Sequence, residues 1–182
     1  MPSFRLESER LLLREPELSD APAIAALMND WDVVKNLSRA PFPYREEHAH
    51  EFLARQEEGR AKGTDFTFTL VRKSDRAMIG KCGLHLQEAG FEMGYWLGRP
   101  YWNQGYATEA AAQVLMFGFR NLRAEHIWAG WFHDNPASGH VLEKLGFRPN
   151  GSARRDCAAR GETVLCNQVT MSRAEFGQRS AA

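Results

Sequence analysis

The chain has 182 residues, a length that favours a single domain built around one hydrophobic core. Basic residues (Lys and Arg) and acidic residues (Asp and Glu) both number 23, so the chain lacks the basic excess typical of nucleic-acid-binding proteins. It has neither an apolar run of about 18 residues nor an apolar N-terminal segment, so we expect a cytoplasmic protein without a membrane partner.

The first third of the chain predicts one strand followed by helices. Residues 10–14 form a compact apolar run ended by a proline, which is typical of a strand. Residues 19–28 begin with helix-capping side chains and then carry apolar residues at helical spacing. A short helix is expected at 31–37, and a longer, charged helix at 45–61.

The middle of the chain changes to the two-residue period of β-strands. Apolar side chains alternate with threonines over residues 65–71, and further strands are expected at 78–86 and 91–97. Turn-forming residues separate these three segments. They therefore predict an antiparallel meander.

The last third of the chain returns to alternating helices and strands. An alanine-rich segment at 108–119 predicts a buried helix, 126–132 a strand, and 136–145 another helix. A final pair of strands is expected at 147–155 and 162–171.

These elements predict an α+β fold with a mixed, mostly antiparallel central sheet of about seven strands, flanked by about four helices. We expect one domain over residues 1–182, with a short disordered tail at about 176–182. Cys82, Cys157 and Cys166 form no C-x-x-C pair. Their odd number and spacing argue against a disulfide framework or a structural zinc site, so no metal is expected.

One strand–loop–helix segment is the best candidate for a binding site. The strand at 91–97 leads through a loop to Gln104-Gly105-Tyr106-Ala107, where a helix begins. A glycine at this position lets the backbone approach a ligand closely. The first turn of a helix also offers free N–H groups and a partial positive charge, which suit a phosphate. Many helices begin after a glycine, however, and the dinucleotide pattern G-x-G-x-x-G is absent.

A second helix begins directly after a strand, at Asn135-Pro136-Ala137-Ser138, where Asn135 is a natural N-cap. Taken together, the segments 92–97, 101–110 and 135–147 resemble the GNAT superfamily of acyltransferases. Within that superfamily they are similar to the ribosomal-protein N-acetyltransferase (RimJ/RimL-like) branch. The resemblance extends over residues 9–147 in both order and spacing.

The resemblance implies a V-shaped splay between the fourth and fifth strands, and acetyl-CoA as a co-substrate. Backbone amides of the turn before the central helix would hold the pyrophosphate, and the splayed strand would pair with pantetheine and the thioester. Asn135 and Ser138 would face the pantetheine and sulfur from the other side. The cofactor-binding residues implied in this way are Tyr95, Trp96, Leu97, Asn103, Gln104, Gly105, Tyr106, Ala107, Thr108, Asn135 and Ser138.

The chain departs from the superfamily pattern in the turn before the central helix. Trp102 stands where the pattern has Arg or Gln, and Asn103 stands where it usually has Gly. Because the turn would bind through its backbone, we expect binding to survive in a stiffer loop.

The resemblance also suggests catalytic roles. Glu92 lies where the family places a catalytic or water-ordering carboxylate, and we expect it to accept the proton of the attacking amine. A structural carboxylate bonded to a neighbouring strand is the alternative. Many members carry a proton-donating tyrosine at the position of Leu142, so here the proton for the leaving thiolate is assigned to Ser138 or water. A backbone N–H near Trp96 is expected to stabilise the oxyanion.

The resemblance predicts an enzyme that transfers acetyl to a primary amine, either a protein N-terminal α-amine or a small molecule, in a ternary complex. A non-catalytic acyl-CoA sensor with the same fold is the alternative, and a homodimer is a reasonable expectation. Ordinary packing would also explain the aromatic residues proposed to line the acceptor pocket. These acceptor-pocket candidates are Trp31, Tyr44, His85 and Trp131, whereas Arg154 and Arg155 are interpreted as solvated surface.

Overall fold

The computed structural model describes residues 4–180. Its centre is an eight-stranded sheet with the order β1-β2-β3-β4-β5-β6-β8-β7, in which every neighbouring pair is antiparallel except β5 and β6. The predicted mixed, mostly antiparallel sheet is therefore confirmed; the additional strand, β1, has two residues and is too short to show a sequence period. The strands are β1 (Leu6–Glu7), β2 (Leu11–Arg14), β3 (Asp65–Arg72), β4 (Met78–Gln87), β5 (Gly90–Leu97), β6 (His126–Phe132), β7 (Arg148–Cys157) and β8 (Glu162–Ser172).

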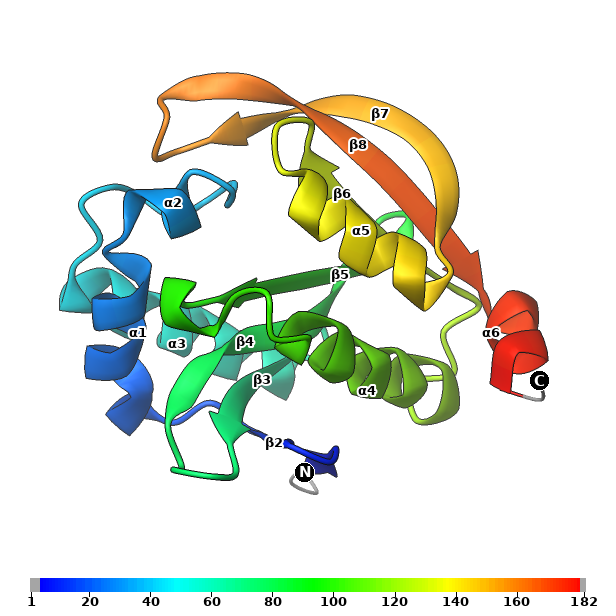
Figure 1. The fold of residues 1–182 in the computed structure, drawn as a ribbon, viewed down its shortest axis with the longest axis horizontal. Helices are drawn as coiled ribbons and strands as arrows, with labels where there is room; N and C mark the ends of the chain where they lie inside the picture. Colours follow the sequence, from blue (N-terminus) through cyan, green and yellow to red (C-terminus); the bar gives the residue numbers. More distant parts are fainter. Residues whose placement is uncertain (1–3, 181–182) are drawn as a thin grey trace.

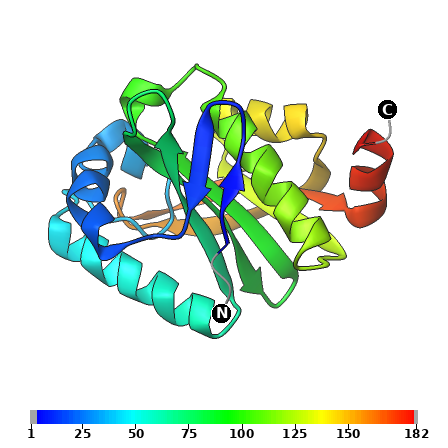
Figure 2. The same cartoon turned by 90° about the horizontal axis from the view of Figure 1, so that it is seen from below.

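Helices cover both faces of this sheet. Figure 2 shows α1 and α3 on one face and α4 and α5 on the other. Over residues 4–180 no helix is long and apolar enough to cross a bilayer. The α-helices of this part of the chain are α1 (Ala21–Met28), α2 (Trp31–Val34), α3 (Glu46–Ala61), α4 (Tyr106–Arg120), α5 (Pro136–Leu145) and α6 (Arg173–Ser180).

The core is divided by the sheet into two main layers. Beneath α4, apolar side chains of β2, β3, β4 and β5 pack against the buried face of the helix, which includes Ala110, Ala111, Val114 and Leu115. Beneath α1 and α3 the core is also apolar, but it includes buried polar side chains. These polar residues are Asp20, Gln56, Thr67, Thr69 and Lys81.

The C-terminal segment differs from the expectation of a disordered tail at 176–182. Helix α6 runs to residue 180, and residues 181–182 lie outside the described part of the chain. Phe176 stacks on Phe119 of α4, with ring centroids 4.8 Å apart. This contact buries the apolar surface of Phe176 and holds the helix against α4. The otherwise polar sequence of the segment gave no sign of it.

The sheet opens between β5 and β6, as predicted for the fourth and fifth strands. The two parallel strands pair only through Phe91, Glu92 and Met93, which face Ile127, Trp128 and Ala129. Beyond these three pairs the ladder stops, while both strands continue. Figure 1 shows the β7–β8 hairpin arching over β6 and α5, with its turn close to α2.

Candidate active site

The backbone of β5 beyond Met93 presents unpaired groups to the opening. Gly98 donates a hydrogen bond to the Ile79 carbonyl (2.9 Å), which fixes the parity of the β4–β5 ladder. Because alternate residues of an antiparallel pair bond to the same neighbour, Trp96 directs its amide and carbonyl to β4. Tyr95 and Leu97 direct theirs away from β4, into the gap. The backbone N–H groups near Trp96 that face the gap are therefore those of Tyr95 and Leu97.

The turn before α4 has the backbone geometry that a close ligand approach requires. Gly105 adopts φ 80° and ψ −2° as the N-cap of α4, and Asn103 adopts φ 58°. Asparagine is among the few non-glycine residues that tolerate this left-handed region, which explains how it replaces the usual glycine. No side chain caps the helix, and the Glu109 amide donates to the Gly105 carbonyl (3.0 Å). The amides of its first turn therefore face outward without an intrahelical partner.

Arg10, immediately before β2, holds this turn in place, a contact that the sequence pattern did not predict. Its Nη1 donates to the Gln104 carbonyl (2.9 Å), its Nε donates to Glu109 (2.7 Å), and its guanidinium lies over the Tyr106 ring. Ser8 donates to the same Glu109 carboxylate (2.7 Å). The turn between β1 and β2 thus positions the helix entrance from the outside.

Hydroxyl groups meet on the α5 side of the opening. The Asn135 side chain caps α5 by accepting from the Ser138 amide (3.4 Å), as predicted for a natural N-cap. The Ser138 Oγ lies 2.8 Å from the Tyr95 hydroxyl, which also donates to the Ser138 carbonyl. Burial raises the pKa of Tyr95, so this phenol stays protonated and serves as a hydrogen-bond donor to Ser138. Leu142 is buried in the core and contributes no polar group.

A cavity of about 680 Å³ connects these features. Most residues predicted for the site line it, but Gln104 does not; its side-chain amide bonds the Pro100 carbonyl instead (2.9 Å). Trp102, also at the cavity wall, donates its indole N–H to the Leu97 carbonyl (2.8 Å), so that carbonyl is already engaged. The predicted residues that line the cavity are Glu92, Tyr95, Trp96, Leu97, Asn103, Gly105, Tyr106, Ala107, Thr108, Trp131, Asn135 and Ser138.

Of the four side chains expected to line an acceptor pocket, only Trp131 borders the cavity, and it packs beneath α5. Trp31 is exposed and contacts another aromatic ring edge-on. Tyr44 is buried in the core beneath α1 and α3. His85 pairs with Asp65 at 3.0 Å. Packing or a local hydrogen bond thus explains these three residues.

Glu92 lies on the cavity wall but has a partner from a distant strand. Arg155 of β7 places Nη1 2.5 Å from a Glu92 oxygen, and its guanidinium lies over the Trp128 ring. The expectation that both arginines are solvated is therefore wrong for Arg155, whose side chain is only 30% exposed, and right for Arg154. Glu92 therefore has, in Arg155, the kind of strand partner that its alternative, structural role requires.

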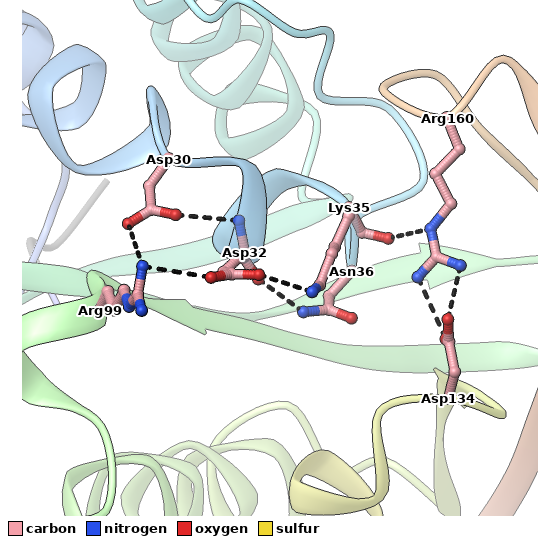
Figure 3. Close-up of polar contacts among 7 residues, drawn as sticks. All are labelled: Asp30, Asp32, Lys35, Asn36, Arg99, Asp134 and Arg160. Atoms are coloured by element: carbon pink, nitrogen blue, oxygen red, sulfur yellow. Dashed lines mark hydrogen bonds and ion pairs between the residues drawn. The ribbon is translucent and has the colours of Figure 1, made fainter.

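The far rim of the cavity is formed by α2 and the residues after it. Figure 3 shows Asp30 and Asp32 facing Arg99, which follows β5, with Asp32 3.2 Å from the guanidinium. The other Asp32 oxygen accepts from Lys35 (2.6 Å). The ion pairs with Arg99 join α2 to the end of β5, on one side of the β5–β6 opening.

Arg160, in the β7–β8 turn, joins the end of α2 to the loop between β6 and α5, on the other side of the β5–β6 opening. Its Nε donates to the Lys35 carbonyl (2.7 Å), and its two terminal nitrogens bind the Asp134 carboxylate at 2.7 and 3.1 Å (Figure 3). Asp134 precedes the α5 cap, so one guanidinium connects α2 to the β6–α5 loop. The Ala158 amide adds a bond to the Ser38 carbonyl (2.9 Å).

The comparison with known protein families matches this arrangement. The acetyltransferase (GNAT) domain matches residues 10–148 of the chain. The chain belongs to the GNAT acetyltransferase family. As a GNAT protein it is an acetyltransferase, as predicted, and the family supports acetyl transfer to an amine. Residues 4–180 contain no group of three or more His, Cys, Asp or Glu side chains arranged to hold a metal ion.

Individual relatives support the RimJ/RimL-like branch. An uncharacterized N-acetyltransferase, p20 of Bacillus licheniformis, is 30% identical over 174 residues, covering 94% of this chain and 97% of p20. The [ribosomal protein uS5]-alanine N-acetyltransferase of Escherichia coli is 24% identical, covering 85% and 83%. In fold, the chain is similar to Mycobacterium smegmatis RimJ in complex with CoA-disulfide, with a TM-score of 0.78, 18% identity and coverage of 98% and 94%.

Proposed function

We propose that this GNAT protein transfers acetyl from acetyl-CoA to a primary amine by direct attack in a ternary complex formed at the β5–β6 opening. The observation that carries the proposal is the juxtaposition, in one cavity, of a glycine-headed helix and a strand whose ladder has stopped. Amides suited to an anion and amides suited to an extended amide-containing chain thus face the same space. A protein α-amine or a small amine is the acceptor.

The turn from Asn103 to Thr108 would hold the pyrophosphate of acetyl-CoA. The first-turn amides of α4 have no intrahelical partner, and the positive end of the helix dipole favours phosphate. Gly105 has a φ of 80°, which favours glycine, and an added Cβ would lie 3.3 Å from Arg10 Nη2. Glycine therefore suits both the backbone conformation and the available space. The absence of a side chain there leaves the amides uncovered.

The amides of Tyr95 and Leu97 would pair with pantetheine and with the thioester oxygen. When bound, acetyl-CoA supplies an activated acyl carbon and a thiolate leaving group. An amide directed at the thioester oxygen stabilises the negative charge that develops there, an effect worth about 3 kcal/mol for comparable donors. The Leu97 carbonyl already accepts a hydrogen bond from the Trp102 side chain. The Leu97 N–H and both backbone groups of Tyr95 are left to pair with the ligand.

Proton transfer would use groups on opposite faces of β5. Glu92 faces the acceptor side and would take the proton from the amine, directly or through water. Ser138 or water would supply the proton to the leaving thiolate, and solvent would return a proton to Ser138, whose Oγ lies 2.8 Å from the Tyr95 hydroxyl. The Tyr95 side chain was not part of the sequence prediction, because the resemblance assigned only its backbone.

The cofactor site is tested by Gly105→Glu with Gly63→Glu as the matched control. Both glycines have positive φ, but Gly63 lies in the turn before β3, away from the cavity. Both variants therefore carry similar backbone strain and the same added charge. We expect calorimetric titration with acetyl-CoA to detect no binding to Gly105→Glu and normal binding to Gly63→Glu. Normal binding to both would place the cofactor elsewhere.

Turnover is tested by thiol release from acetyl-CoA in the presence of an amine panel. The three cysteines of the chain are buried, so a thiol reagent reports mainly on released CoA. Glu92→Gln should lower turnover more than acetyl-CoA affinity, and a pH profile unchanged by this substitution would remove its role as a base. An acyl-CoA sensor, the alternative, would bind acetyl-CoA with no amine-dependent thiol release.

A further inference from the structure

The guanidinium of Arg155 has donors that the fold does not use. Within the described part of the chain its single hydrogen bond goes to Glu92, whereas a guanidinium carries five N–H donors. Trp128 covers one face of the group, and the rest borders the cavity. These donors, on a cation held at the cavity wall by a carboxylate and an aromatic ring, are available to an oxygen acceptor supplied by a ligand.

The position of Arg155 identifies which ligand supplies that oxygen. Side chains alternate along β5, so Glu92 and Trp96 lie on one face and Tyr95 on the other. Tyr95 meets Ser138 on the α5 side, where the cofactor is proposed. Trp96 belongs to the core layer beneath α1, and Glu92 bonds Arg155. Arg155 therefore faces the acceptor.

We propose that Arg155 binds an amide oxygen on the carbon next to the amine-bearing carbon of the acceptor, and so selects α-amino carbonyl compounds over alkylamines. This inference rests on the proposed function and specifies its acceptor. Glu92 and Arg155 are in direct contact, so one pair can engage an amine and the oxygen beside it. An alkylamine offers the amine alone and leaves the Arg155 donors without a partner, which is how polar sites reject analogues.

The charge balance of the site favours a neutral amide oxygen over a carboxylate. Glu92 neutralises Arg155 at 2.5 Å, and the rim carboxylates Asp32 and Asp134 are each bound by a cation. A second carboxylate near Glu92 would meet repulsion as well as attraction. A terminal residue of a chain, or an amino-acid amide, fits better than a free amino acid or a polyamine.

The test compares alaninamide, alanine and isopropylamine as acceptors, with thiol release giving kcat/KM for each. The variants are Arg155→Met, which removes all donors, and Arg155→Lys, which keeps the ion pair but loses the fork. Arg154→Met is the control, because Arg154 is exposed on the other face of β7 and bonds the Thr163 carbonyl. The amine pKa of alaninamide is about two units below that of isopropylamine, so their neutral fractions differ. Because this difference is the same for every variant, it cancels when ratios of kcat/KM are compared between variants.

We expect the wild-type protein to prefer alaninamide to both other amines after correction for the neutral fraction. The ratio of kcat/KM for alaninamide over isopropylamine should fall about 10- to 100-fold in Arg155→Met and Arg155→Lys. It should be unchanged in Arg154→Met, and the KM for acetyl-CoA should be similar in all four proteins. An unchanged ratio in the Arg155 variants, or a wild-type protein without this preference, overturns the proposal.

Failure of the proposed function would look different. If acetyl-CoA binds but no amine releases thiol, the acetyl-transfer proposal fails, and selectivity is decided by binding alone. Calorimetric titration of the CoA-loaded protein with alaninamide then gives the answer. Binding that is lost in Arg155→Met and kept in Arg154→Met supports the role of Arg155, and equal binding to both variants refutes it.

Discussion

Lys81 provides a stability test of the buried layer on which β5 rests. This residue of β4 is 1% exposed, its ammonium donates to Gln56 Oε1 at 2.6 Å, and it lies 5.0 Å from the Phe52 ring. Loss of hydration lowers the pKa of Lys81 from 10.5 to about 7, although the carboxylates of Asp20 and Asp65 act in the opposite direction. We therefore predict that Lys81→Met stabilises the protein at neutral and mildly acidic pH.

The sign and size of this effect follow from proton linkage. Below about pH 7 the lysine is charged in both the folded and unfolded states, and the folded state bears the full cost of about 5 kcal/mol. Between about pH 7 and 10.5 only the unfolded chain binds the proton, so stability rises by about 1.4 kcal/mol per pH unit. Methionine removes this dependence but leaves Gln56 without its donor, at a cost of about 1–2 kcal/mol. The net gain at about pH 6 is then about 3 kcal/mol, and the two stability curves cross at about pH 9.

Urea unfolding followed by tryptophan fluorescence, at a series of pH values from about 6 to 10, measures this difference. Lys81→Met should show a higher free energy of unfolding at the acidic end and a flatter pH dependence than the wild-type protein. The denaturant slopes should be similar, because both chains bury the same surface. Parallel pH profiles for the two proteins would refute a depressed lysine pKa, and a destabilised variant at about pH 6 would show that the hydrogen bond outweighs desolvation.

The other predictions concern the rim and the same buried layer. Arg160→Met breaks the bonds to Lys35 and Asp134, so the KM for the acceptor should rise about tenfold while acetyl-CoA affinity, measured by calorimetry, changes less. An equal loss in both would indicate general unfolding. Asp20→Asn should lower the free energy of unfolding by about 3 kcal/mol at neutral pH. Burial opposes the ionisation of Asp20, but hydrogen bonds from Arg14 and other groups around the carboxylate hold the pKa of Asp20 below 3.8. This contribution to stability is therefore present above pH 3.8 and is lost as acid protonates Asp20. Urea titrations of both proteins should converge at low pH, and a constant gap would contradict this assignment.

Much of the fold was predictable because its patterns are local. The two-residue period over β3 and the alanine-rich spacing of α4 each arise from which face of one element is buried. The turn at Gly105 was also predictable, since its glycine and the helix that follows are adjacent in sequence. The splay required the family resemblance, because residue patterns do not indicate where a ladder stops.

The acceptor side could not be predicted because its contacts are made between distant segments. Glu92 and Arg155 are 63 positions apart, and they meet only because the β7–β8 hairpin curves over β6. Arg154 and Arg155 are chemically identical neighbours, and only the strand pleat decides which of them faces the cavity. Tyr44, which was expected in the acceptor pocket, lies in the core. In sequence, an aromatic side chain buried by core packing looks the same as one that lines a pocket.

The location of the site follows from how a sheet satisfies its backbone. Amides within a complete ladder are paired, so a strand can offer them to a ligand only where its ladder ends. Here the β5–β6 ladder ends after Met93, close to the entrances of α4 and α5. Beyond that point alternate amides of β5, those of Tyr95 and Leu97, face the gap, while its side chains alternate between the proposed cofactor and acceptor sides. A shift of one residue in the β4–β5 register would turn the Trp96 amide into the gap and exchange the two faces. The bond from Gly98 to the Ile79 carbonyl, which fixes that register, therefore contributes to the chemistry as much as the side chains it positions.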